Sequence, residues 1–351
     1  MTEQKTMPTR EIYGDILRII AAFSVVFQHT ASSAWYSLNP VQNSWLVLNF
    51  FNSSARFGVG IFVMLSGAFL LSPKKDYSPK QIFKTKVPYL LKLIAFWVIF
   101  YGIFQVFIQG FSWKEFLSVP LLAFTKPQTH LWFLYMLAGL YLFTPALRIF
   151  TTHASEKMLR LTLIMLVIFG MCVPTISYLI KRFADIQVYS LLTIQGTTSY
   201  LAYYLAGLYF SHFSISNRSK KWIYALAIFS FIVSFIGSTY LSLVRNSPDE
   251  FFLGNMRPTN FIMVIAIFIF FKDFSSELNV SSKFINLCSR TTLGIYLIHP
   301  VFLKIFYGLK LQLISPTPWL NVPLTAFSIF LLSFTLVFIF ILNIFMQDFF
   351  D

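Results

Sequence analysis

Long apolar runs, separated by short polar stretches, follow one another along the whole chain. Those long enough to be membrane spans lie near residues 12–33, 57–72, 88–109, 131–150, 159–180, 198–213, 222–244, 257–272, 291–309 and 322–346. A helix rises 1.5 Å per residue and has to cross about 30 Å of hydrocarbon, so most of these runs suffice and the shortest are marginal. Because backbone groups in lipid must be hydrogen-bonded within their own segment, every run is predicted to be a helix.

The composition agrees with a chain whose main solvent is lipid. Its residues are 57% hydrophobic and 11% charged, whereas soluble domains carry about 25% charged residues. The sequence therefore predicts an all-α polytopic membrane protein with about ten transmembrane helices. We expect a single membrane-embedded domain over residues 1–351, with no appended soluble domain and no cleaved signal peptide.

Positive charge exceeds negative charge by 14. In a soluble protein this excess would favour nucleic acid, but here the basic residues gather in alternate loops between the predicted spans. The loop 73–87 alone carries five lysines. Under the positive-inside rule these loops face the cytoplasm, so both termini are predicted to be cytoplasmic and no nucleic-acid partner is expected.

The absence of some motifs narrows the chemistry. The chain has no GxxxxGK[ST] phosphate loop, no HExxH or CxxC metal pattern and no GxSxG nucleophile elbow. Cys172 and Cys288, the only cysteines, are too few for a disulfide framework. We expect no bound metal.

The first span contains residues that are costly in lipid. Arg18 and His29 are eleven positions apart, which places them on one helix face about 16 Å apart along the axis. Asp15 lies three residues before Arg18 and can pair with it. An ionisable residue in a span usually faces a cavity or a partner. The alternative is that Arg18 and Asp15 only hold the bundle together.

Two further residues are predicted at the outer level of His29. Arg56 begins the second span and His130 begins the fourth. The three side chains are predicted to line one outward-facing pocket, in which a histidine suits general-base work on a hydroxyl. The structural alternative for His29 is an ordinary hydrogen bond at the membrane interface.

The ninth span carries a polar stripe, and the third span begins among lysines. Thr292, Tyr296 and His299 fall at i, i+4 and i+7, which is one helical face or a polar seam. At the inner side, Lys84, Lys86 and Lys92 are predicted to attract an anionic ligand together with Arg18. Lys92 alternatively extends its charge to the interface.

These residues resemble the signature of the acyltransferase family 3 membrane proteins. The resemblance rests on the Arg-x10-His spacing of the first span and on three segments in order: SARFGVGIFVMLSGAFLL at 54–71, HLWFLYMLAGLYLFTP at 130–145 and TTLGIYLIHP at 291–300. It is greatest to the small stand-alone branch that includes the O-acetyltransferase of enterobacterial common antigen. One departure is that many members carry arginines before the third span, where this chain has Lys84 and Lys86. Lysine keeps the charge but loses the bidentate geometry toward phosphate.

The resemblance implies an O-acyltransferase of the bacterial cytoplasmic (inner) membrane. It would move an acyl group, acetyl by default and succinyl as an alternative, from acyl-CoA to a hydroxyl of a surface polysaccharide or lipid-linked glycan. Acetyl-CoA would be the donor, with no permanently bound cofactor. Arg18 and the three lysines would hold the phosphates, His29 would deprotonate the acceptor, and Arg56 or Tyr296 would stabilise the oxyanion. His130, His299 and Asp15 complete the predicted site, in which direct attack and a covalent acyl relay are both open.

Two other classes of protein fit the same pattern of spans. A transporter or flippase of a glycan precursor also carries charges within its spans, although no inverted repeat is evident. A non-catalytic sensor or scaffold is the third reading.

Overall fold

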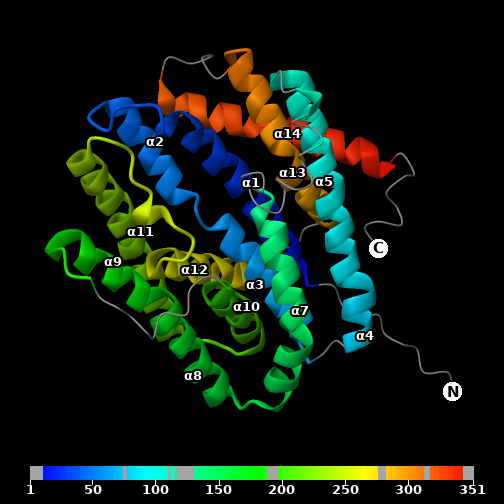
Figure 1. The fold of residues 1–351 in the computed structure, drawn as a ribbon. Helices are drawn as coiled ribbons and strands as arrows, with labels where there is room; N and C mark the ends of the chain where they lie inside the picture. Colours follow the sequence, from blue (N-terminus) through cyan, green and yellow to red (C-terminus); the bar gives the residue numbers. More distant parts are fainter. Residues whose placement is uncertain are drawn as a thin grey trace. The chain divides into compact units, whose positions relative to one another are not determined.

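In the computed structural model, the described residues are 11–73, 77–109, 112–114, 117, 130–187, 197–275, 282–311 and 317–342. Over these ranges the chain is built from helices and contains no strand (Figure 1). The helices are α1 (Ile12–Trp35), α2 (Asn43–Ser54), α3 (Gly58–Leu70), α4 (Pro79–Gln81), α5 (Val87–Gln109), α7 (Trp132–His153), α8 (Glu156–Val167), α9 (Val173–Ala184), α10 (Thr197–His212), α11 (Asn217–Arg245), α12 (Pro258–Ser275), α13 (Ser282–Gly308) and α14 (Pro318–Leu342). Short π-helical turns η1 (Ile82–Lys86) and η2 (Ile168–Cys172) and a 3-10 turn η3 (Phe251–Leu253) join some of them.

The all-α polytopic class is confirmed. Within the described residues, 8 helical stretches are long and apolar enough to cross a membrane. Predicted spans 198–213 and 291–309 also form helices, α10 and α13, but are not among these stretches. The α10 helix has 16 residues, which gives about 24 Å of length. The first turns of α13 hold Lys283 and Arg290 and are too polar for the hydrocarbon.

The sequence predicts no helix between the spans 12–33 and 57–72, but the structure forms α2 in this segment. That helix has a buried stripe at i, i+3, i+4 and i+7, formed by Trp45, Leu48, Asn49 and Asn52. Asparagines on the buried face made the segment look like a loop. Together α2 and α3 form one 28-residue stretch long and apolar enough to span the membrane. Most of the segment between the spans predicted at 88–109 and 131–150, residues 188–196 and both termini lie outside the described residues.

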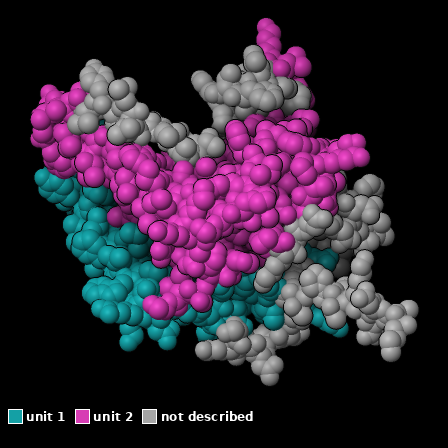
Figure 2. Space-filling model, turned by 90° about the horizontal axis from the view of Figure 1, so that it is seen from below, with its two compact units in different colours: residues 1–61, 217–253, 262–351 teal, residues 62–216, 254–261 magenta. Residues whose placement is uncertain are grey.

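The chain forms two compact units, each made of separate sequence segments (Figure 2). Unit 1 contains residues 1–61, 217–253 and 262–351, and unit 2 contains residues 62–216 and 254–261. The expectation of a single domain over 1–351 stays a prediction.

In unit 1, α1 packs against α2, α13 and α14. Its buried face is rich in small residues, including Ala21, Ala22 and Ala31, which allow close approach of neighbouring helices. At the end of α1, the rings of Trp35 and Trp45 stack with centroids 5.5 Å apart. Helix α1 is thus the element around which unit 1 is organised.

Side-chain contacts give the relative directions of these helices. Asp15 of α1 meets Ser289 of α13, and further along both helices Thr30 meets Tyr307, so α1 and α13 run in the same direction. Figure 1 shows these two helices, from opposite ends of the sequence, side by side. The first and ninth predicted spans should share a direction, and they do.

In unit 2, α3 and α10 approach each other through a reciprocal pair of glycines. A Cβ atom added to Gly67 would lie 1.8 Å from the carbonyl oxygen of Tyr204, and one added to Gly207 would lie 1.8 Å from the carbonyl oxygen of Met64. No residue larger than glycine fits at either position without moving a helix. The Ser66–Gly67 pair of the second span therefore has a packing role at its glycine.

Candidate active site

Two histidines from the opposite ends of the chain meet in unit 1. Helix α1 carries His29 and α13 carries His299, and Nδ1 of His29 lies 2.8 Å from Nε2 of His299. The rings are inclined by 28°, with centroids 5.0 Å apart. His299 is fully buried and His29 is half-buried. The sequence placed these residues on two separate helical faces, and the structure brings them into direct contact.

The surroundings of His299 determine where the protons of the neutral pair lie. Nδ1 of His299 is 2.7 Å from the carbonyl oxygen of Tyr296. A carbonyl only accepts, so this nitrogen carries the hydrogen, and Nε2 of neutral His299 is an acceptor. Nδ1–H of His29 therefore donates to it. The lone pair of His29 is left on Nε2, for which no hydrogen bond occurs among the described residues. This is the atom that can take a proton from a substrate.

Arg56 lies in the turn between α2 and α3 and acts electrostatically on the His29 imidazole. Its Nε and Nη2 atoms are buried and have no hydrogen-bond partner among the described residues. Buried N–H groups without acceptors are unfavourable, so such groups usually meet a ligand or a water. Its Nε–H and Nη2–H groups are thus available to a ligand, and its charge acts on His29.

The turn that holds Arg56 is fixed along α1 by contacts on both sides of it. Ser24 Oγ donates a hydrogen bond of 2.7 Å to the carbonyl oxygen of Ala55. Three residues later, Gly58 lies so close to α1 that an added Cβ would be 2.7 Å from the carbonyl oxygen of Ala21. Residues 52–58 therefore run antiparallel to α1, with the Arg56 turn at the level of Ala21 and Ser24, before His29 along the helix.

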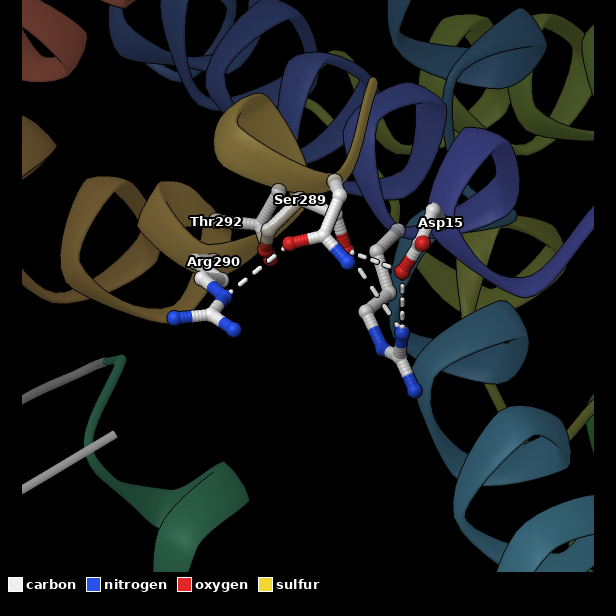
Figure 3. Close-up of polar contacts among 6 residues, drawn as sticks. Asp15, Ser289, Arg290 and Thr292 are labelled. Atoms are coloured by element: carbon white, nitrogen blue, oxygen red, sulfur yellow. Dashed lines mark hydrogen bonds and ion pairs between the residues drawn. The ribbon is translucent and has the colours of Figure 1, made fainter. Parts of the chain in front are cut away.

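A second polar cluster ties the beginning of α1 to α13 (Figure 3). Nη1 of Arg18 pairs with Oδ1 of Asp15 at 2.8 Å, as their spacing predicts. Ser289 Oγ donates to the same oxygen at 2.7 Å. Asp15 is 3% exposed, whereas the side chain of Arg18 remains 31% exposed. The carboxylate thus anchors a guanidinium that solvent or a ligand can still reach.

The polar stripe of α13 is divided between structural and site residues. Thr292 donates its hydroxyl to the carbonyl oxygen of Ser289 within its own helix. Tyr296 is buried, and its ring centroid lies 6.1 Å from that of His299. The oxyanion role of Tyr296 stays a prediction.

The remaining predicted residues belong to unit 2. His130, just before α7, is buried, and its ring centroid lies 4.7 Å from that of Tyr101. Lys84 and Lys86 are carried by η1, and Lys92 projects from an exposed position of α5. The pocket shared by His29, Arg56 and His130, and the phosphate site shared by Arg18 and the lysines, each draw on both units and stay predictions.

Three polar residues near this site were not predicted from the sequence. Gln28 and Asn52 lie at the contact between α1 and α2, and Ser289 lies on α13. The available signal was a polar residue at the buried spacing of an apolar helix, as in Asn49 and Asn52. That signal is lost once the segment is read as a loop.

The fold and this cluster define a multi-pass α-helical membrane protein with a histidine pair at the contact of its first helix and a helix near its end. The profile of the acyltransferase domain family, acyltransferase family 3, matches residues 11–342. The chain therefore belongs to this family, and it is a membrane acyltransferase. Comparisons with curated proteins and with solved structures give no match.

Proposed function

We propose that the protein transfers an acyl group, acetyl by default, from acyl-CoA to a hydroxyl of a cell-surface carbohydrate, within the bacterial inner membrane. The observation that carries the proposal is the His29–His299 contact, which leaves Nε2 of His29 as a base. The buried Nε and Nη2 atoms of Arg56, which have no partner among the described residues, and the action of its charge on His29 support the same chemistry. Family membership supports acyl transfer, and the choice of donor and acceptor is our inference.

The proposed reaction begins with proton transfer to His29. Nε2 takes the proton of the acceptor hydroxyl. At the same time, the hydroxyl oxygen attacks the thioester carbonyl carbon, and a C–O bond forms. Negative charge develops on the carbonyl oxygen, where Arg56 stabilises it. The C–S bond then breaks, and the thiolate leaving group receives the proton from His29. A covalent acyl relay would use the same groups in two successive transfers.

His299 assists by holding the imidazole of His29. As His29 becomes an imidazolium, its Nδ1–H bond to the neutral Nε2 of His299 is strengthened by the charge. The hydrogen bond from Nδ1 of His299 to the Tyr296 carbonyl fixes the His299 tautomer in turn. The Tyr296 carbonyl, His299 and His29 thus form a chain of hydrogen bonds that ends at the substrate proton. In catalytic triads, a third group orients the catalytic histidine in the same way.

The donor fits the axis of α1. Arg18 and His29 lie about 16 Å apart along the helix, and Arg18 is the accessible cation of the Asp15 pair. Phosphates of acyl-CoA would lie near Arg18, and the extended pantetheine arm would carry the thioester toward His29.

The proposal is tested by measuring ester-linked acyl groups on the surface glycans of a deletion strain that carries wild-type protein, His29→Ala or His153→Ala. His153 is an exposed histidine of α7 and serves as the matched control. We expect wild type and His153→Ala to restore the ester and His29→Ala to fail at equal membrane abundance. Equal restoration by all three proteins would refute the role of His29. No ester in any strain, together with no acyl-CoA cleavage in detergent, would favour the transporter alternative.

A further inference from the structure

We propose that the side-chain amide of Asn52 is a further catalytic group, which donates a hydrogen bond to the acyl oxygen jointly with Arg56. This inference rests on the proposed function and adds a residue that neither the motifs nor the family resemblance points to. Two buried asparagines on one face of α2, Asn49 and Asn52, differ in their hydrogen bonds.

Asn49, one turn before Asn52, has a complete set of partners. Its Oδ1 accepts hydrogen bonds from Trp35 Nε1 at 3.0 Å and from Ser238 Oγ at 3.2 Å. Its Nδ2 donates to Thr239 Oγ1 at 2.9 Å and to the Phe235 carbonyl at 3.3 Å. This amide connects α1, α2 and α11, and its role is structural.

Asn52 is equally buried, at 0% exposure, but its amide is only half satisfied. Its Oδ1 accepts a long hydrogen bond of 3.4 Å from Gln28 Nε2. Its Nδ2 is buried and has no partner among the described residues. Leaving a buried donor unpaired costs about 1–3 kcal/mol, so a native protein retains one mainly where a ligand or a water completes it.

Asn52 and Arg56 both lie on the segment that packs against α1. They are four residues apart, at the end of α2 and in the turn that follows it. Gln28, which contacts Asn52, is the residue before His29, and Arg56 acts electrostatically on His29 itself. Two side chains about one helical turn apart therefore leave Nδ2 of Asn52, and Nε and Nη2 of Arg56, without hydrogen-bond partners among the described residues, on the segment that packs against the helix of His29.

An acyl oxygen matches this arrangement. When the acceptor oxygen bonds to the thioester carbonyl carbon, the C=O π electrons move onto the carbonyl oxygen, which becomes an oxyanion. Preorganised N–H donors stabilise that charge more than they stabilise the neutral thioester, and this difference lowers the barrier. Arg56 supplies positive charge, and Asn52 supplies a neutral, directional donor. Gln28 donates to the Asn52 amide oxygen, which leaves Nδ2 as the unused donor of this amide.

The test compares Asn52→Leu with Asn49→Leu, two changes of similar volume on one helix. Purified wild type and variants are assayed with acetyl-CoA and a glycan acceptor that wild type uses, and their Tm values are measured in the same detergent. For Asn52→Leu we expect kcat to fall about 10²–10³-fold, the KM for acetyl-CoA to change little, and Tm to stay equal or rise. For Asn49→Leu we expect a lower Tm, with near-normal kcat per folded molecule.

A second variant distinguishes the loss of the Nδ2–H donor from a change in side-chain shape. Asn52→Asp has the same outline but presents an oxygen in place of Nδ2–H, and it should lose at least as much kcat as Asn52→Leu. Wild-type kcat in either variant, or a Tm loss in Asn52→Leu as large as that of Asn49→Leu, would overturn the inference. If wild type itself transfers no acyl group, the proposed function fails. If wild type transfers it and the Asn52 variants do so equally well, only the role of Asn52 fails.

Discussion

Nδ1 of His29 and Nε2 of His299 lie 2.8 Å apart, within one hydrogen bond, although 270 positions separate them in the sequence. The contact makes His299 a positioning residue for the proposed base. Any substitution at 299 therefore tests whether the tautomer of His29 matters to the reaction.

His299→Leu removes the acceptor for Nδ1–H of His29. We expect kcat to fall about 10²-fold or more with little change in KM, because the base is no longer oriented. His299→Gln presents an oxygen that can accept the same hydrogen and should keep more activity than His299→Leu. Steady-state kinetics of the purified proteins check this order. Equal activity of both variants and wild type would show that the contact is not used in catalysis.

Arg18 is predicted to bind donor phosphate. For Arg18→Gln we expect the KM for acetyl-CoA to rise about tenfold or more, since a charged hydrogen bond contributes about 1.5–3 kcal/mol. Acetyl-pantetheine lacks the nucleotide phosphates, so wild type and Arg18→Gln should use it with similar KM. A KM difference that persists with acetyl-pantetheine would place Arg18 in a structural role with Asp15.

The lysines of η1 are predicted to act through charge alone. The double variant Lys84→Gln/Lys86→Gln should raise the KM for acetyl-CoA and weaken its dependence on ionic strength, because screening acts on exposed charges. Lys157→Gln, which removes an exposed lysine of α8, is the control and should leave the salt dependence unchanged. The measurement is KM at low and high salt. An unchanged profile in the double variant would remove these lysines from the donor site.

Gly67 is predicted to tolerate no side chain. A Cβ there would lie 1.8 Å from a backbone oxygen of α10, so Gly67→Ala must separate α3 from α10. We expect a lower Tm and less folded protein in the membrane. Gly139→Ala is the matched control, because nothing lies within 4 Å of its added Cβ. Similar Tm values for both variants would contradict the packing assigned to Gly67.

Most helices were predictable because the apolar runs that cross lipid have nearly the length of the helices themselves. The spans predicted at 88–109 and 257–272 correspond to α5 (Val87–Gln109) and α12 (Pro258–Ser275). The prediction was less accurate where a helix continues past its apolar part, as α13 does over its first turns. It failed for α2, whose buried face includes asparagines, because hydropathy does not distinguish a polar residue in water from one with buried partners.

The site was predictable only as far as its contacts are local. The Asp15–Arg18 pair follows from helical spacing. The contact of His29 with His299 and that of Asp15 with Ser289 depend on which helices pack together and at what register. Neither hydropathy nor spacing contains that information. Asn52 was missed because its significance lies in a hydrogen bond that the fold does not make.

The pairing of α1 with α13 also constrains the order in which the protein can become active. During synthesis the first helix inserts long before the ribosome reaches residue 299, so His29 spends that interval without its partner. A chain that is truncated or stalled anywhere before α13 carries the proposed base but not the residue that orients it. Assembly of the proposed centre is therefore one of the last events of biogenesis.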